Sequence, residues 1–288
     1  MISQTREDCM LIDNAIASRR RQDRLRATLT VVLGTLLTVV SNTAAIDLSP
    51  SDALRIGKKV WQNECNGTIA GLTSWNEGEK FASLGIGHFI WYPAGQRGPF
   101  DESFPKLVSF AAARGVKLPA VLLKTGAKDC PWNSRSEFVG ASNTPQMKEL
   151  RQFLADTVHL QAQFLVDRLQ QAMPKMLAEV PSPAERAEMQ RQFERVAGTA
   201  NGCYALVDYV NFKGEGVLDT ERYRGQGWGL CQVLQGMSGN EKGASAVREF
   251  AESARNVLRQ RVRNSPPERK ESRWLAGWLQ RINTYSQS

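Results

Sequence analysis

Histidine is scarce in this chain: only His88 and His159 occur among 288 residues. Cysteine is also sparse, and its five residues are scattered along the sequence. A structural zinc site requires cysteine and histidine ligands at short, regular spacings. The sequence has no such cluster, so we expect neither a metal site nor a cofactor.

The chain also lacks an apolar run of the roughly 20 residues that a membrane-spanning helix needs. Its apolar stretch at 27–40 is shorter and carries several threonines. A basic segment at 19–26 precedes it and small residues at 41–45 follow, an order typical of a secretory signal. We expect cleavage after about Ala45 and a periplasmic or secreted protein, with membrane contact only through this segment. An uncleaved inner-membrane anchor is the alternative.

Low-complexity segments and internal repeats are absent, and the composition is that of an ordinary globular protein, with 42% hydrophobic and 23% charged residues. The formal net charge is +8. Such a surface attracts nucleic acid, anionic lipid or an acidic polymer such as a bacterial wall. Charge alone does not choose among these partners.

The cysteines are compatible with export. Cys9 precedes the apolar run, so a cleaved chain keeps four: Cys65, Cys130, Cys203 and Cys231. Disulfides persist in oxidising compartments. We expect a bridge between Cys203 and Cys231, on neighbouring helices, which leaves Cys65 and Cys130 to pair. The alternative is four buried free thiols.

The first half of the chain reads as a small mixed lobe. Residues 47–64 predict an amphipathic helix that begins at Ser49 or Ser51 and is closed by the Asn66-Gly67 pair. From 73 to 92, short extended runs are broken by glycines, which predicts a small sheet with tight turns. A short helix ending at Gly115 follows, and 124–145 looks irregular.

Beyond residue 145 the hydrophobic period is helical almost to the end. One long helix is expected over 146–173 as the connection between lobes, and further helices are expected near 183–198, 203–212, 226–237, 241–263 and 267–285. The predicted fold class is α+β, mainly α. It comprises the segment 1–45, a small lobe with a short β-sheet over 46–145, and a larger helical lobe over 146–288, with a substrate cleft between lobes.

Three carboxylates are predicted near this cleft. Glu64 ends the first helix beside Trp61, and Glu77 and Glu79 flank a glycine turn. Hydrolysis of a glycosidic bond needs a protonated acid in apolar surroundings and usually a second carboxylate. Ser83 is placed to hold a water. The residues therefore favour glycosidase chemistry.

The order of these residues resembles that of the phage-type lysozymes (glycoside hydrolase family 24). In that family a helix delivers the catalytic glutamate, a turn carries a second acid, and a threonine then begins a segment much like "IGIGH". Here Glu64 matches the catalytic glutamate and Glu77 the second acid. "SLGIGH" at 83–88 matches the following segment, with Ser83 in the place of the threonine.

The resemblance continues in the second half of the chain. "YALVDYVNFKGEG" at 204–216 looks like the family's interior helix, and "RVRNSPPERKESRWLAGW" at 261–278 looks like its closing segment. Three matches in the correct order imply a lysozyme-like fold. They also imply a muramidase that cleaves peptidoglycan glycan strands, not nucleic acid, with Glu64 as general acid.

The chain departs from the family in three ways. Twelve residues separate Glu64 from Glu77, which is more than the family usually has, glutamate replaces aspartate, and serine replaces threonine. A lytic transglycosylase that uses Glu64 alone is therefore one alternative. A non-catalytic lysozyme-fold protein that binds the wall or a partner is another.

Aromatic side chains follow the motif, and Trp75, Trp91 and Tyr92 are candidates to stack on sugar rings. The competing interpretation is that they fill the hinge between lobes. Glu79 is a further substrate-binding candidate, although turn glutamates are commonly solvent-facing.

His88 is a candidate substrate contact, but we favour a structural role in which its imidazole pairs with a carboxylate or backbone group. Together with Cys65 it also suggests a thiol protease. That interpretation is disfavoured because the cysteine follows its helix rather than starting one.

Overall fold

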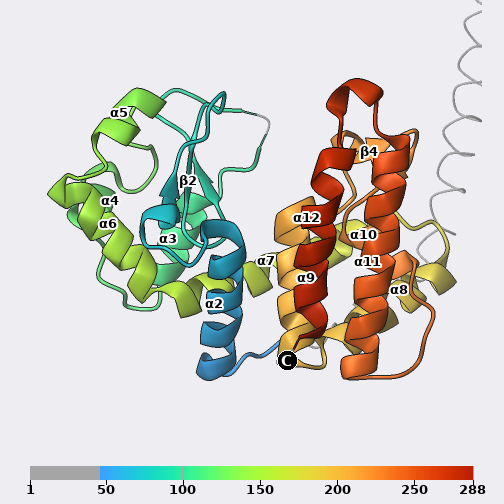
Figure 1. The fold of residues 1–288 in the computed structure, drawn as a ribbon. Helices are drawn as coiled ribbons and strands as arrows, with labels where there is room; N and C mark the ends of the chain where they lie inside the picture. The colour runs from blue at the N-terminus through green and yellow to red at the C-terminus, as the bar shows by residue number, and fades with distance from the viewer. Residues whose placement is uncertain (1–45, 99, 288) are drawn as a thin grey trace, which may run out of the picture. The chain divides into compact units, whose positions relative to one another are not determined.

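The computed structural model describes residues 46–98 and 100–287 (Figure 1). The expected signal segment at 1–45, with its apolar run and Cys9, lies outside the described residues. Within the part that is described, none of the helices combines the length and apolarity needed to cross a bilayer.

The described chain is α+β and mainly helical, as the sequence predicts. The sheet-bearing part comprises helix α2 (Pro50–Cys65), a 3-10 turn at Ala70–Leu72, strands β1 (Thr73–Ser74), β2 (Ala82–Leu84) and β3 (Phe89–Trp91), and helices α3 (Phe104–Ala112), α4 (Ala120–Thr125), α5 (Arg135–Gly140) and α6 (Pro145–Asp156). The strands form an antiparallel sheet in the order β1-β2-β3. Ser83 at its centre pairs with Ser74 and Ile90.

The rest of the chain is helical except for a two-stranded hairpin. Its elements are α7 (Val158–Ala178), α8 (Pro183–Ala197), α9 (Ala200–Lys213), β4 (Arg222–Tyr223), β5 (Gln226–Gly227), α10 (Leu230–Gln235), α11 (Ala244–Asn264) and α12 (Ser272–Asn283), with 3-10 turns at Asp219–Glu221, Pro267–Arg269 and Thr284–Ser286. Figure 1 shows α7 passing from the sheet-bearing part toward these helices. α2 packs against both α7 and α9, so it contacts both parts of the chain.

The single helix expected over 146–173 is a misprediction, because the chain breaks at Thr157 into α6 and α7. The Thr157 hydroxyl donates to the Phe153 carbonyl at 2.7 Å. The fully buried Gln161 amide donates to the Leu154 carbonyl at 2.6 Å and so satisfies an acceptor at the break. The oxygen of that same amide reaches the sheet-bearing part, accepting from the Ile86 backbone N–H at 2.9 Å.

Two further local predictions are corrected. The stretch at 124–145 is not irregular throughout, because α5 begins there with the Ser134 hydroxyl accepting from the Glu137 backbone N–H. Part of the stretch read as helix from 226 is strand β5, paired with β4. Glycines at 225 and 227 provide the tight turn and close approach that favour a hairpin.

The four cysteines that the structure describes are buried free thiols, so neither expected disulfide is present. Their sulfurs have separate surroundings. The Cys203 thiol donates to the Ala197 carbonyl at 3.1 Å, whereas the Cys65 thiol donates to the Gly85 carbonyl at 3.7 Å. Burial raises the pKa of Cys130 to about 12 and that of Cys231 to about 11, so both remain protonated at neutral pH.

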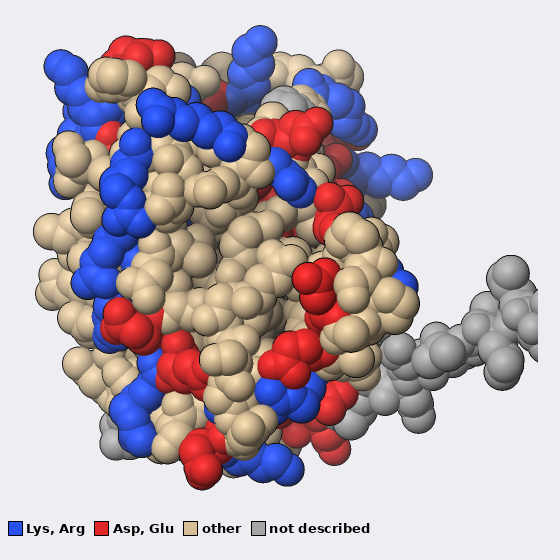
Figure 2. Space-filling model, turned by 90° about the vertical axis from the view of Figure 1, so that its right-hand side faces the viewer, with Lys and Arg blue, Asp and Glu red and all other residues tan. Residues whose placement is uncertain are grey.

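The surface charge on the face seen in Figure 2 is mixed. Lys and Arg side chains follow one edge and the upper end of that face, while Asp and Glu side chains are interspersed below and opposite. Elsewhere in the described chain, surface charges pair with each other, as Arg255 does with Glu252 at 3.0 Å. Such exposed pairs contribute little to stability.

Candidate functional site

The site is centred on Glu64, the penultimate residue of α2. The helix starts where the Ser49 hydroxyl accepts from the Asp52 backbone N–H, and it ends where Asn66 adopts a left-handed conformation with φ 53°. This stop leaves Glu64 at the helix end, where α2 meets α9 and the sheet. Its side chain is 13% exposed.

The helical part of the chain holds one oxygen of Glu64. Oε1 accepts from Asn211 Nδ2 at 3.0 Å and from Arg281 Nη2 at 2.5 Å. Arg281 comes from α12 and also donates to both oxygens of Asp208, each at 2.8 Å. A fully buried carboxylate therefore orients the guanidinium that binds Glu64.

Asp208 is itself saturated with donors. Besides Arg281, it accepts from the Tyr285 hydroxyl at 2.7 Å and from Asn63 Nδ2 at 3.0 Å. Burial alone would lower the pKa of Arg281, but the charge and hydrogen bonds of Asp208 outweigh it and raise that pKa well above its usual range. Burial and the charge of Asp208 raise the pKa of Tyr285, so the phenol stays a donor. This network is a fixed polar support for Glu64.

The sheet-bearing part presents His88 to the other oxygen. His88 Nδ1 lies 3.7 Å from Glu64 Oε2, and Nε2 lies 3.8 Å from Cys65 Sγ. The imidazole is 33% exposed and lies beside a carboxylate, beyond hydrogen-bond distance, and the structural role that we favoured for it stays a prediction. Burial and the charge of Glu64 raise the pKa of Cys65 to about 12, which keeps it a thiol and argues against a cysteine nucleophile.

Glycines bring His88 into place. Gly85 has φ +70°, and a Cβ there would collide with the Gln161 side chain that binds Ile86. At Gly87 a Cβ would lie 2.6 Å from the ring of Phe89. His88 itself has a backbone φ of 47°, which residues other than glycine seldom adopt. The segment is thus shaped so that the backbone turns tightly above α7.

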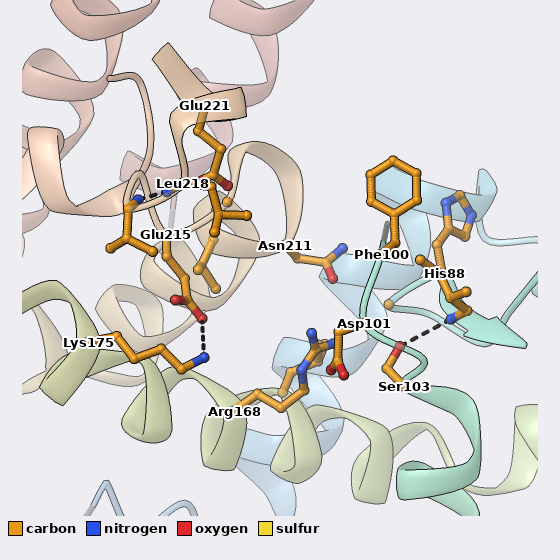
Figure 3. A pocket seen from close by; sticks show the side chains of 16 residues that line it. His88, Phe100, Asp101, Ser103, Arg168, Lys175, Asn211, Glu215, Leu218 and Glu221 are labelled. Atoms are coloured by element: carbon orange, nitrogen blue, oxygen red, sulfur yellow. Dashed lines mark hydrogen bonds and ion pairs between the residues drawn. The ribbon is translucent and has the colours of Figure 1, made fainter. Parts of the chain in front are cut away.

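A cavity of about 610 Å³ opens beside this constellation. His88 and Asn211, two of the groups that contact Glu64, line it. Figure 3 shows its walls: Phe100, Asp101 and Ser103 from the loop before α3 on one side, Arg168 and Lys175 rising from α7, and Glu215, Leu218 and Glu221 on the other side. The volume is within the range usual for ligand sites.

Two exposed apolar side chains lie at this cavity. Phe100 is 57% exposed and Leu218 is 59% exposed, and they come from opposite parts of the chain. The ring of Phe100 packs edge-on against Phe81 at 5.8 Å between centroids. Apolar surface left open at a polar cavity suits the faces of sugar rings.

The charged groups of the cavity differ in their partners. Lys175 Nζ lies 3.3 Å from Glu215 Oε1, and Asp101 binds Lys106 at 2.7 Å. Glu221 accepts from three consecutive backbone N–H groups, those of Gly216, Val217 and Leu218. Among the interactions of the described residues, Arg168 takes part in no hydrogen bond or ion pair.

A buried lysine lies behind the Glu64 site. Lys213, at the end of α9, places Nζ 3.4 Å from the ring centroid of Trp278 and 3.9 Å from that of Phe212. Burial, reinforced by the positive charges of Arg261 and Arg281, lowers its pKa to about 6. The amine is therefore largely uncharged at neutral pH.

The second acid and the serine of the sequence motif are not joined to Glu64 by any contact among the described residues. Glu77 is exposed in the turn between β1 and β2. Glu79 in the same turn accepts from Asn76 Nδ2 at 3.1 Å, and its carbonyl accepts from Trp75 Nε1. Ser83 is buried in β2. The roles proposed for these three residues stay predictions.

The aromatic residues predicted to stack on sugars are packed in the core of the sheet-bearing part. Trp91 is fully buried against Phe104 and Trp132, and Tyr92 packs against Phe81. Trp75 is also buried and contacts Phe138 edge-on. Their faces meet other side chains of the sheet-bearing part, and none of the three lines the cavity described above.

Sequence reasoning missed Arg281, Asp208, Arg168, Phe100 and Leu218. No local pattern marks them, because Arg281 lies 217 residues from Glu64 along the chain. The segment at 204–216 was recognised through its resemblance, and it does contain Asn211 and Asp208. The exposed apolar residues carry only a weak signal, since single exposed hydrophobic residues are common.

Comparison with protein-family models, with curated proteins and with solved structures finds no match to this chain. The interpretation of the site therefore rests on its residues and their geometry.

Proposed function

We propose that this protein is an exported, peptidoglycan-degrading glycosidase of lysozyme-like fold, in which Glu64 is the general acid. The observation that carries the proposal is the asymmetric setting of the Glu64 carboxylate, which lies next to two cavity-lining residues, His88 and Asn211. Oε1 binds Arg281 and Asn211, while among the described residues the polar group found near Oε2 is His88, at 3.7 Å and beyond hydrogen-bond distance.

This asymmetry suits proton transfer. The donors on Oε1 fix the plane of the carboxyl group and leave Oε2 as the oxygen that carries a proton to the leaving glycosidic oxygen. Arg281 forms ion pairs with both Glu64 and Asp208. The negative charge of the buried Asp208 therefore partly offsets the positive charge that Arg281 places next to Glu64.

The shape of the cavity is compatible with a polysaccharide. It is walled by both parts of the chain and has apolar side chains, Phe100 and Leu218, on opposite sides. Gly87 brings backbone to its wall without a side chain. A sugar ring would meet apolar faces and polar edges there, as carbohydrate sites require.

The proposal is tested by Glu64→Gln on purified cell wall in a zymogram, with Glu252→Gln on the exposed face of α11 as the matched control. Clearing lost in the first variant and kept in the second is expected. If Glu64→Gln clears wall as fast as the unmodified protein, Glu64 is not the acid. A folded protein that binds wall without clearing it would instead be the non-catalytic alternative.

A lytic transglycosylase is the second candidate, and the exposed position of Glu77 favours it, because that reaction needs one acid/base. In it, the sugar's own hydroxyl attacks the anomeric carbon. Mass spectrometry of the digest separates the two: reducing ends indicate hydrolysis and anhydro-sugar ends indicate transglycosylation. Hydrolysis further requires that Glu77→Gln lowers the rate strongly, whereas a single-acid mechanism leaves the rate of that variant nearly unchanged.

A further inference from the structure

One cation of the cavity, Arg168, differs from the neighbouring charges in its bonding. Arg168 projects from α7 between Asp101 and Glu215, and both acids are near enough to influence its guanidinium electrostatically. Yet Asp101 binds Lys106 and Glu215 binds Lys175. In the described part of the chain, Arg168 is therefore the cavity-lining charge that has no hydrogen bond or ion pair.

An unpaired guanidinium in such a place has a cost. α7 and the cavity walls withdraw part of its side chain from water, and within the described chain no hydrogen bond or ion pair replaces the lost hydration. Burial also lowers its pKa, but an arginine stays charged at neutral pH. The five N–H donors of the Arg168 guanidinium are therefore available to an anion that enters the cavity.

The neighbouring groups limit what that anion can be. Ser103 uses its hydroxyl to accept from the Ile90 backbone N–H at 3.1 Å, and Asp101 and Glu221 add negative charge to the walls. A highly charged anion such as a phosphate would be repelled by these acids, whereas a single carboxylate matches the planar fork of one arginine.

We propose that Arg168 forms a carboxylate-binding subsite for the muramyl residues of the glycan strand. This inference rests on the proposed function and adds the chemical group of the substrate, a carboxylate, that Arg168 recognises. A muramyl residue carries a lactyl carboxyl group, free on bare strands or amide-linked to a peptide stem that has its own carboxylates. Neutral chitin chains lack both groups.

The subsite is tested by binding rather than by cleavage, with Glu64→Gln as the background so that ligand is not consumed. Three fluorescent glycan fragments serve as probes: one with peptide stems, one bare with free lactyl carboxylates, and one whose carboxyl groups are converted to methylamides. In the background protein, the neutralised fragment is expected to bind about tenfold or more weakly than a carboxylate-bearing one.

Arg168→Gln in the same background should remove that discrimination, so that charged and neutralised fragments bind equally. Lys175→Gln is the matched control, because it removes one positive charge from the same helix and the same cavity but from a group already paired with Glu215. It should keep the discrimination. Arg168→Lys, which keeps the charge without the fork, should keep part of it and guards against loss of fold.

The outcomes separate the two proposals. Equal binding of charged and neutralised fragments by the background protein overturns the subsite, even if the unmodified enzyme cleaves wall. Loss of discrimination in Lys175→Gln as large as in Arg168→Gln also overturns it, because the effect is then one of general charge. Discrimination that depends on Arg168 in a protein without lytic activity would leave the subsite standing and remove the glycosidase. The bare and stem-bearing fragments show which carboxylate is bound.

Discussion

The two parts of the chain hold the Glu64 site in different ways. The helical part contributes short, charge-assisted bonds: Arg281 at 2.5 Å from Glu64, and Asp208 at 2.8 Å from the same guanidinium. The sheet-bearing part contributes His88 at 3.7 Å, placed by a glycine-rich turn. The helical part holds one carboxylate oxygen of Glu64 by hydrogen bonds, whereas the described sheet-bearing part forms no hydrogen bond with the other oxygen.

The difference teaches how a carboxyl group can be both oriented and reactive. A carboxylate with bonds to both oxygens is stabilised in its charged form and has no free oxygen to donate a proton. Here the bonded oxygen faces the buried network and the open oxygen faces the half-exposed imidazole. The predictions below test whether this division holds.

The largest effect is expected for Asp208→Asn. The change replaces the fully buried one of the two carboxylates that Arg281 binds with a neutral amide, and breaking a buried ion pair costs about 3–5 kcal/mol of unfolding free energy. Urea unfolding at neutral pH measures it. Glu252→Gln, which breaks the exposed contact with Arg255, should change stability by less than about 1 kcal/mol. Equal effects of the two changes would show that the network does not anchor the site.

Lys213 should make stability depend on pH. Its pKa is about 6 in the folded protein and about 10.4 in an unfolded chain, so between these values only the unfolded chain binds the proton. The unfolding free energy therefore falls as pH is lowered from about 10 to about 6. Below about pH 6 both states bind the proton, and the contribution of Lys213 no longer changes with pH. Lys213→Met removes the proton site and keeps the contacts with Phe212 and Trp278.

The test is the unfolding free energy of the Lys213→Met variant minus that of the unmodified protein, measured from pH 6 to pH 9. This difference should grow by at least about 1 kcal/mol toward the acidic end. Lys175→Met, at an exposed lysine, should give a difference that does not vary with pH. A constant difference for Lys213→Met would mean that the amine is charged in the folded protein.

On the sheet-bearing side, Gly85→Ala should cost about 1–3 kcal/mol. The alanine backbone must keep φ +70°, which is strained for a residue with a Cβ. That Cβ must also displace the Gln161 side chain, which accepts a hydrogen bond from the Ile86 N–H. Gly78→Ala is the control, since its φ is +82° but a Cβ there meets nothing within 4 Å. Comparison of the two melting curves isolates the packing cost at Gly85. The same cost at both glycines would show that Gln161 adapts freely.

The parts of the fold that the sequence predicted are those with local causes. Helix α2 follows from its period, the Ser49 cap and the Asn66 stop, and the three strands follow from the glycines between them. The break at Thr157 was missed because the period runs through it, and only the contacts of Gln161 reveal it. Helix α5 had a readable signal, Ser134 followed three residues later by Glu137.

The candidate site divides along the same line. Glu64 and His88 were predicted because they lie in one ordered motif, and the structure brings them within 3.7 Å. Arg281 depends on the packing of α12 onto α9, which has no local signature. The aromatic residues were placed in the cleft by residue type alone, and burial removes Trp91 entirely from solvent. Composition cannot distinguish a core tryptophan from a sugar platform.

The smallest change in stability is expected for His88→Gln. The imidazole is half-exposed and its contacts with Glu64 and Cys65 are long, so its removal should alter the unfolding free energy by less than about 1 kcal/mol. Glutamine keeps a polar side chain near Oε2. If His88 contacts the substrate from the cavity wall and does not hold Glu64, wall clearing should fall several-fold in this variant while the melting curve stays unchanged. A loss of stability as large as that of Asp208→Asn would show that both sides fix Glu64 equally, and the division between a bound oxygen and a free one would be abandoned.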